Sequence, residues 1–133
     1  MDALEGLWRL ADSRAVDEQT ERLTVPYGAH PLGHIVFSKG RMLVALCKGD
    51  VDVGPDGDRG FSSYGGRYVF DGTTLQCEVD MASDRRRIGT HLVRGVVMLA
   101  ENEFLLRPPA RRYGSKLDRR ELVWDRVWRP VDD

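Results

Sequence analysis

Short runs of alternating apolar and polar residues, separated by residues typical of tight turns, extend along almost the whole 133-residue chain. Strict alternation is the pattern of a β-strand that buries one face, whereas an amphipathic helix needs apolar residues every three or four positions. The pattern therefore predicts an all-β protein. Eight segments fit it: Gly6–Ala15, Gly33–Ser38, Arg41–Lys48, Phe61–Phe70, Thr73–Met81, Gly89–Leu99, Glu103–Pro108 and Leu117–Trp128.

Helical periodicity is weak throughout the chain. A short helical turn is expected at Asp2–Glu5, where Asp2 is suited to be the N-cap, and a second brief helical segment is an option near Asp17–Arg22.

The connections between the eight segments favour one closed sheet. Lys39-Gly40, Asp71-Gly72 and Ala100–Asn102 each supply a residue that accepts a positive φ, as tight hairpin turns require. Eight sequential antiparallel strands predict a single domain, residues 1–133, folded as an up-and-down barrel that leaves no sheet edge exposed. A Greek-key sandwich is the alternative architecture.

Composition and charge narrow the class of function. The net charge of −1 gives no basis for binding nucleic acid or an anionic membrane surface. No apolar run reaches about 18 residues, so a membrane-spanning helix is not expected. The opening MDALEGLWRL lacks the basic and apolar regions of a signal peptide, and we therefore expect a cytoplasmic protein.

Cysteine and histidine spacing predicts neither a metal site nor a cofactor. Cys47 and Cys77 fit no CxxC spacing and are expected to be reduced thiols. His30, His34 and His91 match no zinc template.

The turn at Asp71-Gly72 predicts which side chains share a face. A two-residue turn gives the pairs Phe70–Thr73, Tyr68–Leu75, Gly66–Cys77 and Tyr64–Val79. Directly opposed residues share a face. The apolar residues of the second strand, which alternate with polar ones, are Leu75, Cys77, Val79 and Met81. The face that holds Tyr64, Tyr68 and Cys77 is therefore predicted to point inward.

Two further hairpins extend this inner face. The Lys39-Gly40 turn pairs Phe37 with Met42 and Ile35 with Val44. The residues that it leaves on the outer face are His34 and Val36.

The Ala100–Asn102 loop predicts an arginine inside the barrel. It pairs Met98 with Phe104, and alternation along the preceding strand then directs Leu92 and Arg94 inward. Inside an eight-stranded barrel there is room for side chains or for one small ligand.

An inward Arg94 beside two tyrosines is the main candidate site. A mostly apolar interior with a few oriented polar groups is typical of a ligand chamber. Arg94 is suited to clamp a carboxylate, phenolate or enolate, and Tyr64 and Tyr68 to polarise a carbonyl or transfer a proton if Arg94 lowers their pKa. The alternatives are a structural arginine and core packing by the tyrosines. The expected ligand contacts are Phe37, Met42, Val44, Cys77, Met81, Met98, Phe104 and Trp124.

Two basic runs are predicted to be turns at one rim of the barrel. They are DRRR at 84–87 and ARRYGSK at 110–116. A solvated loop is the simpler interpretation of each, and steering of an anionic ligand is the alternative.

The motifs, taken together, resemble a known family. GLWRL at 6–10 resembles the Gly-x-Trp opening of lipocalins, in which an arginine of the last strand packs across the tryptophan; Arg126, two positions after Trp124, is the matching arginine. Arg126 is expected to close the base of the barrel together with Trp8 and Trp124. Four further stretches resemble the bacterial and fungal lipocalin-like domain proteins, in order along nearly the whole chain: PLGHIVFSKGRMLV (31–44), YGGRYVFDGTTLQCEV (64–79), IGTHLVR (88–94) and LVWDRVW (122–128).

The resemblance implies a lipocalin-like (calycin) barrel that binds a small hydrophobic molecule, such as an aromatic or polyketide-like metabolite. Two functions stay open: a cofactor-free isomerase, cyclase, hydratase or other lyase of secondary metabolism, and a non-catalytic carrier or sensor. The family often has a histidine on the fifth strand, in a pattern like T-x-T-H-H-x-E. This chain has TLQCEVD there, with Cys77 at the inward position. A homodimer through the outward side chains of Leu43, Ala45 and Cys47 is a further expectation.

Overall fold

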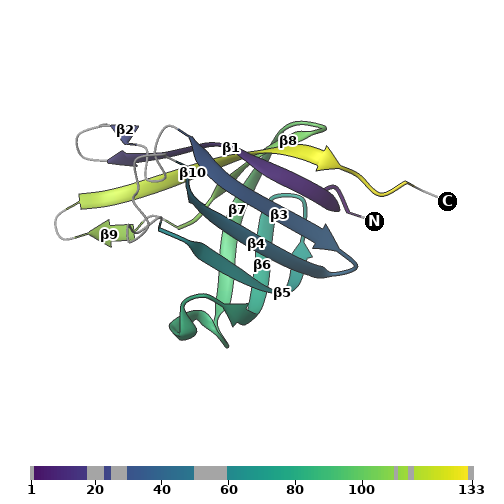
Figure 1. The fold of residues 1–133 in the computed structure, drawn as a ribbon, viewed down its shortest axis with the longest axis horizontal. Helices are drawn as coiled ribbons and strands as arrows, with labels where there is room; N and C mark the ends of the chain where they lie inside the picture. Colours follow the sequence, from purple (N-terminus) through teal and green to yellow (C-terminus); the bar gives the residue numbers. More distant parts are fainter. Residues whose placement is uncertain are drawn as a thin grey trace.

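The computed structural model of the chain describes residues 2–17, 23–24, 30–49, 60–109, 111–113 and 116–131. These residues form ten β-strands and one short 3-10 turn (Figure 1). The strands are β1 (Gly6–Asp17), β2 (Leu23–Thr24), β3 (Pro31–Ser38), β4 (Arg41–Lys48), β5 (Ser62–Phe70), β6 (Thr74–Ala82), β7 (His91–Ala100), β8 (Glu103–Arg107), β9 (Arg111–Tyr113) and β10 (Lys116–Trp128), and the turn is η1 (Arg85–Arg87). No helix in this part of the chain is long and apolar enough to cross a lipid bilayer.

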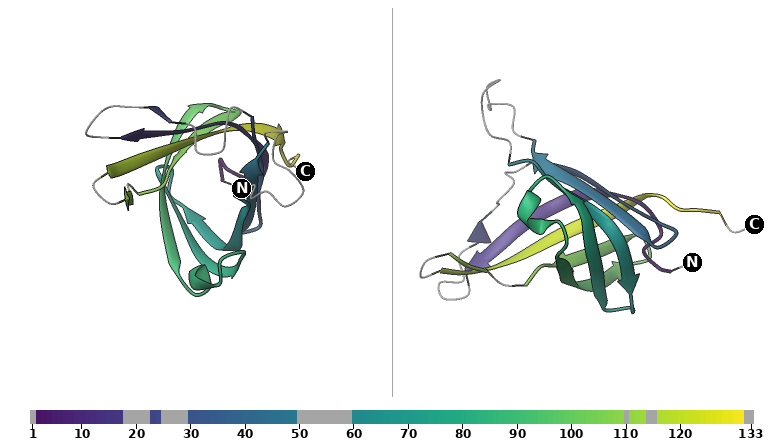
Figure 2. Two further views of the ribbon diagram at one scale, coloured as in Figure 1. Left: turned by 60° about the vertical axis from the view of Figure 1, so that its left-hand side comes forward. Right: turned by 90° about the horizontal axis from the view of Figure 1, so that it is seen from below.

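Eight of the strands form a closed antiparallel barrel. Their order around the ring is β1-β3-β4-β5-β6-β7-β8-β10, and β10 pairs with β1 to close it. The short strands β2 and β9 pair with parts of β1 and β10 that project to one side of the ring (Figures 1 and 2). The predicted all-β, up-and-down barrel is therefore confirmed, and the sandwich alternative is wrong. Of the second helical option, Asp17 ends β1 and residues 18–22 lie outside the described part of the chain.

The β3–β4 hairpin has the predicted register. Lys39 and Gly40 both have positive φ, 51° and 79°, as a two-residue turn between twisted strands requires. Phe37 pairs with Met42. The side chains that this register buries are Ile35, Phe37, Met42 and Val44.

The β5–β6 hairpin has a different register from the predicted one, although the same faces are buried. The Asp71 N–H donates to the Thr74 carbonyl (3.2 Å), and Asp71 Oδ1 accepts hydrogen bonds from the N–H groups of Thr73 (2.9 Å) and Thr74 (2.7 Å), so the turn lies at Gly72-Thr73, one residue later than predicted. Tyr68 consequently pairs with Cys77, two residues further along β6 than predicted. Because the shift is even, the inward side of each strand is unchanged.

The predicted inward position of Met81 is wrong. The ladder between β5 and β6 shifts between Gly65 and Gly66, so that Gly66 pairs with Val79 and Gly65 with Met81. One extra residue of β6 is accommodated there, which moves the following side chain to the opposite face. Met81 is therefore on the outer surface, with 42% of its area exposed.

The β7–β8 hairpin confirms the predicted pair of Met98 with Phe104, and Val96 pairs with Leu106. Arg94 is half-buried and pairs with Leu75 of β6, which is fully buried on the inner face. The outward positions of Leu43, Ala45 and Cys47 also follow from the observed alternation along β4. The homodimer stays a prediction.

One end of the barrel is closed by the residues before β1. The predicted turn is present, and Asp2 Oδ1 caps it by accepting a hydrogen bond from the N–H of Leu4 (2.8 Å). Trp8 donates its indole N–H to the Leu4 carbonyl (2.8 Å), and the guanidinium of Arg126 lies 4.3 Å from the centre of the Trp8 ring. The contact between these two residues that the family resemblance predicts is confirmed.

A cluster of aromatic rings fills the interior above this closed end. The rings of Trp8 and Phe104 meet edge to face at 4.6 Å, and those of Phe37 and Tyr68 at 5.0 Å. Trp124 stacks beside Phe104 with 6.5 Å between centroids. The interior at this end is therefore filled by packed aromatic side chains, each of them at most 6% exposed.

Candidate functional site

A cavity of about 650 Å³ lies at the end of the barrel opposite the N-terminal turn. It is formed where β4, β6 and β8 end and where β5, β7 and β10 begin. It reaches the surface beside exposed residues such as Thr90 and Pro109. Its described lining residues are Val44, Leu46, Ser62, Tyr64, Asp84, Arg86, Arg87, Thr90, Leu92, Arg94, Leu106, Pro108, Pro109, Arg120, Leu122 and Trp124.

The inner wall of the cavity is apolar because the strands alternate. Leu122 and Trp124 are two residues apart on β10, and Leu106 of β8 pairs directly with Leu122. Val44 and Leu46 are likewise two residues apart on β4 and therefore point to the same side. Trp124 has 0% exposure and forms the floor, where the cavity meets the aromatic cluster.

The rim and side wall are strongly basic. Among the described lining residues there are four arginines, Arg86, Arg87, Arg94 and Arg120, and one carboxylate, Asp84. Arg120 is on the inner face of β10 by the same alternation that directs Leu122 and Trp124 inward.

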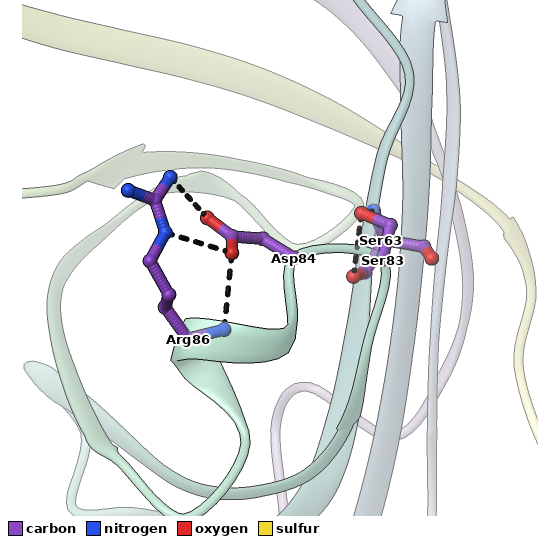
Figure 3. Close-up of polar contacts among 4 residues, drawn as sticks. All are labelled: Ser63, Ser83, Asp84 and Arg86. Carbon is purple, nitrogen blue, oxygen red and sulfur yellow. Dashed lines mark hydrogen bonds and ion pairs between the residues drawn. The ribbon is translucent and has the colours of Figure 1, made fainter.

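Asp84 and Arg86 form a closed pair at the start of η1 (Figure 3). Asp84 Oδ1 accepts hydrogen bonds from the backbone N–H (3.0 Å) and Nε (3.1 Å) of Arg86, and Oδ2 accepts one from Nη2 (3.1 Å). These hydrogen bonds lower the pKa of the Asp84 carboxyl. The turn is also held against β5, because Ser83 and Ser63 exchange hydrogen bonds through the Ser63 N–H (3.0 Å) and the Ser83 N–H (2.8 Å) (Figure 3). Asp84 is thus a capping residue with its charge already paired.

The turn brings Arg87 over the ring of Tyr64, on the neighbouring strand. The centre of the Arg87 guanidinium lies 5.7 Å from the centroid of the Tyr64 ring. Arg94, half-buried, reaches the same tyrosine from β7, and its Nη1 donates to the Val93 carbonyl (3.0 Å). Three elements, β5, η1 and β7, therefore converge on one buried phenol.

Tyr64 is a neutral hydrogen-bonding group. Only 7% of its surface is exposed, and this burial raises the pKa of its phenol. The charge of Arg94, a hydrogen bond from Arg94 and the charge of Arg87 act in the opposite direction without outweighing burial. Proton transfer by Tyr64 had the condition that Arg94 lowers its pKa, and this condition is not met because burial has the larger effect.

Tyr68 and Cys77 lie outside the cavity. The Tyr68 hydroxyl donates to Asp2 Oδ2 (2.7 Å) at the closed end, and burial followed by this hydrogen bond raises its pKa. Cys77 is in the core beneath the cavity, and burial raises its pKa to about 11. All three side chains point inward as predicted, but only Tyr64 lines the cavity with Arg94.

The other predicted ligand contacts divide into three groups. Val44 and Trp124 line the cavity. The core residues that do not line it are Phe37, Met42, Cys77 and Phe104, with Met98 half-buried against them. Met81 is on the outer surface.

Several lining residues were missed by sequence reasoning. The inward positions of Leu46, Arg120 and Leu122 could have been predicted from strand alternation, because Val44 and Trp124 were already placed inward. The position of Arg87 could not have been predicted in this way, because a short turn has no alternating pattern. The solvated-loop interpretation of the 84–87 run holds for exposed Arg85 and Arg86 and fails for Arg87.

The proline pair after β8 shapes one side of the mouth. Pro108 and Pro109 have no N–H to donate, and β8 ends at Arg107. The last ladder pairs place Arg94 of β7 and Arg120 of β10 just beyond this end. Arg94 and Arg120 thus flank the point where the prolines leave the sheet, and all four residues line the cavity.

Neither the cavity nor the rest of the described chain brings together a metal-binding group. No three His, Cys, Asp or Glu side chains of the described residues lie close enough to share a metal ion. His91 lies on the outer surface, with its Nε2 2.8 Å from Gln76 Oε1.

These features define a class: an antiparallel up-and-down β-barrel that is closed at one end and hollow at the other. The chain is similar to a redesigned beta barrel (11% identity, TM-score 0.47, covering 93% of this chain and 91% of that one). It is also similar to a de novo designed fluorescence-activating beta barrel (12% identity, TM-score 0.45, covering 95% of this chain and 98% of that one). Neither likeness bears on ligand or activity. No protein-family profile and no curated protein matches the chain.

Proposed function

We propose that this chain is a lipocalin-like barrel that binds one small hydrophobic molecule in the cavity beneath η1. The observation that carries the proposal is the 650 Å³ chamber, whose inner wall of Val44, Leu106 and Trp124 is apolar and whose mouth is polar and basic. Binding sites for small molecules are typically chambers of this size, and eight-stranded barrels often provide them.

The lipocalin-like assignment is supported by the closed end. Gly6 and Trp8 open β1, and the Arg126 guanidinium of the last strand packs on the Trp8 ring at 4.3 Å. This contact seals the base and leaves the opposite end as the route of entry.

Binding without catalysis is the first choice because the cavity offers few groups that accept a proton. The Tyr64 phenol stays protonated, Asp84 is held by Arg86, and Tyr68 is bonded to Asp2 away from the cavity. No histidine is among the described residues that line the chamber. A carrier or sensor uses these groups as they are, whereas an isomerase or cyclase also needs a base.

The binding proposal is tested by titrating the protein with Nile red, an uncharged dye whose emission changes in apolar surroundings. We expect saturable binding of one dye molecule per chain. Leu92→Trp, which fills the chamber, is expected to weaken binding roughly tenfold. The matched control Val93→Trp adds the same ring to the outer face of the same strand and should leave the affinity unchanged. No saturable binding, or equal effects of the two variants, would contradict the proposal.

The enzymatic alternative is that Tyr64 and Arg94, which lie side by side at the cavity, donate hydrogen bonds to the carbonyl oxygen of a bound ketone while a water molecule takes the α-proton. A ketone that binds in the chamber should then exchange its α-protons with deuterated solvent faster than without protein, as followed by proton NMR. Tyr64→Phe should abolish the acceleration. Exchange at the uncatalysed rate for ligands that do bind leaves the carrier function as the conclusion.

A further inference from the structure

We propose that the molecule bound in this chamber is a carboxylate with an apolar body, and that its head is held at the mouth by Arg87, Arg94 and the hydroxyl of Tyr64. This inference rests on the proposed function and adds the chemical class of the ligand and the direction in which it lies.

The positive charge at the mouth is a local concentration. The whole chain has 20 Lys and Arg against 21 Asp and Glu, so its sequence is nearly neutral. The described cavity lining has four arginines and a single aspartate. A cleft with one sign of charge and low-dielectric walls raises the local concentration of ions of the opposite sign.

The arginines of the mouth differ in their environments. Arg86 is exposed and its guanidinium is engaged by Asp84 through two hydrogen bonds of 3.1 Å. Arg87 and Arg94 are half-buried beside Tyr64. Partial burial strengthens the attraction of a guanidinium for an anion relative to the same pair in water. Arg87 and Arg94, which lie beside Tyr64, are therefore expected to contribute more to binding than Arg86.

The guanidinium groups of Arg87 and Arg94 and the hydroxyl of Tyr64 are all hydrogen-bond donors, as binding of a carboxylate requires. A guanidinium donates two parallel hydrogen bonds to the two oxygens of a carboxylate, and Arg87 and Arg94 reach Tyr64 from different elements. The Tyr64 phenol is protonated, so its hydroxyl donates to an anion and does not repel it.

The orientation of the ligand follows from the positions of the apolar groups. Leu106 and Trp124 are fully enclosed and lie away from η1, whereas Thr90 and Pro109 are exposed at the rim. A ligand with its carboxylate at the arginines therefore extends its apolar body inward, over Leu106 and Leu122, toward Trp124.

The inference is tested by calorimetric titration of dodecanoic acid and dodecanol, which have the same tail, below the concentration at which they aggregate. A charge-assisted hydrogen bond predicts that the acid binds about 10- to 100-fold more tightly than the alcohol. Arg94→Met and Arg87→Met should each reduce this preference about tenfold while the alcohol binds as before. Tyr64→Phe, which removes one oxygen atom, should reduce it severalfold.

The matched control is Arg85→Met. Arg85 is the exposed first residue of η1 and is not among the lining residues, so its loss changes the net charge by the same amount without touching the site. It should leave both affinities unchanged. An equal loss in all three arginine variants would show that only overall charge matters and would overturn the assignment of Arg87 and Arg94.

The wild-type comparison does not depend on any variant being folded. Equal affinities of acid and alcohol would overturn the inference and leave the proposed function standing. If neither dodecanoic acid nor dodecanol binds, and Nile red does not bind either, the proposed function is overturned as well. Dodecyl phosphate serves as a third ligand, and if it binds more than about tenfold more tightly than the acid, the head group is a phosphate and the carboxylate assignment is wrong.

Discussion

Burial has the largest effect on the pKa values of Tyr64, Tyr68 and Cys77, three acidic side chains on the inner face. For each of them burial is the largest cause of a raised pKa. Arg94 counteracts burial at Tyr64 and at Cys77. These three side chains therefore carry no charge at neutral pH, and the positive charge of the described cavity lining comes from its arginines.

This environment predicts an unreactive thiol at Cys77. At pH 8, three units below a pKa of about 11, about one Cys77 thiol in a thousand is ionised. In a Cys47→Ser background we expect iodoacetamide to modify the native protein far more slowly than it modifies the urea-unfolded protein, as followed by mass spectrometry. Equal rates for the folded and unfolded chains would contradict the assigned environment.

The same pKa shifts predict a loss of stability at high pH. Cys77, with a pKa raised from 9.0 to about 11, and the two tyrosines have higher values folded than unfolded. The unfolded chain therefore releases these protons first, so the stability is fully present below the unfolded values and is lost as the pH rises toward the folded ones. Urea unfolding should give a lower free energy at about pH 10 than at about pH 8. Cys77→Val should show a smaller decrease, and a free energy that rises over this interval would contradict the prediction.

At the scale of elements, the N-terminal turn is part of the barrel. Asp2 joins two segments 66 residues apart by capping Leu4 with one carboxylate oxygen and accepting the Tyr68 hydroxyl with the other. The turn then covers the aromatic cluster of Trp8 and Phe37.

A double-mutant cycle tests this closure. Asp2→Ala and Tyr68→Phe are each expected to lower the free energy of unfolding by about 1–3 kcal/mol. The double variant should lose less than the sum, because the shared hydrogen bond is counted once. Urea unfolding of the four proteins measures the coupling, and strict additivity would show that the hydrogen bond contributes nothing.

The shift in the β5–β6 ladder depends on a close approach of two backbones at Gly66. A Cβ atom at this position would overlap the carbonyl oxygen of Glu78, whereas one at Gly95 of β7 would have its nearest neighbour, Arg107 Cβ, at 3.7 Å. Gly66→Ala should therefore destabilise the fold by about 2 kcal/mol or more. Gly95→Ala should change the melting temperature little. Similar effects of the two substitutions would contradict the described register.

At the scale of the whole molecule, the topology was predictable from sequence and part of the site was not. Hairpin parity placed Tyr64 and Arg94 on the inner face. For Tyr64 this held although the turn after Asp71 lies one residue later than predicted, because the register then moves by two residues. Met81 was misplaced because one extra residue in β6 reverses all later positions, and no local pattern marks it. Arg87 and the partner of Tyr68 depend on contacts between distant segments, which periodicity does not encode.

The central claim is that the barrel holds a hydrophobic molecule inside the end opposite its N-terminal turn. The most direct test is to measure intermolecular nuclear Overhauser effects between bound dodecanol and the methyl groups of the protein. We expect contacts to Val44, Leu106 and Leu122, which line the chamber. Contacts confined to outer-face methyl groups such as those of Val69 and Val97, or none at all, would contradict it.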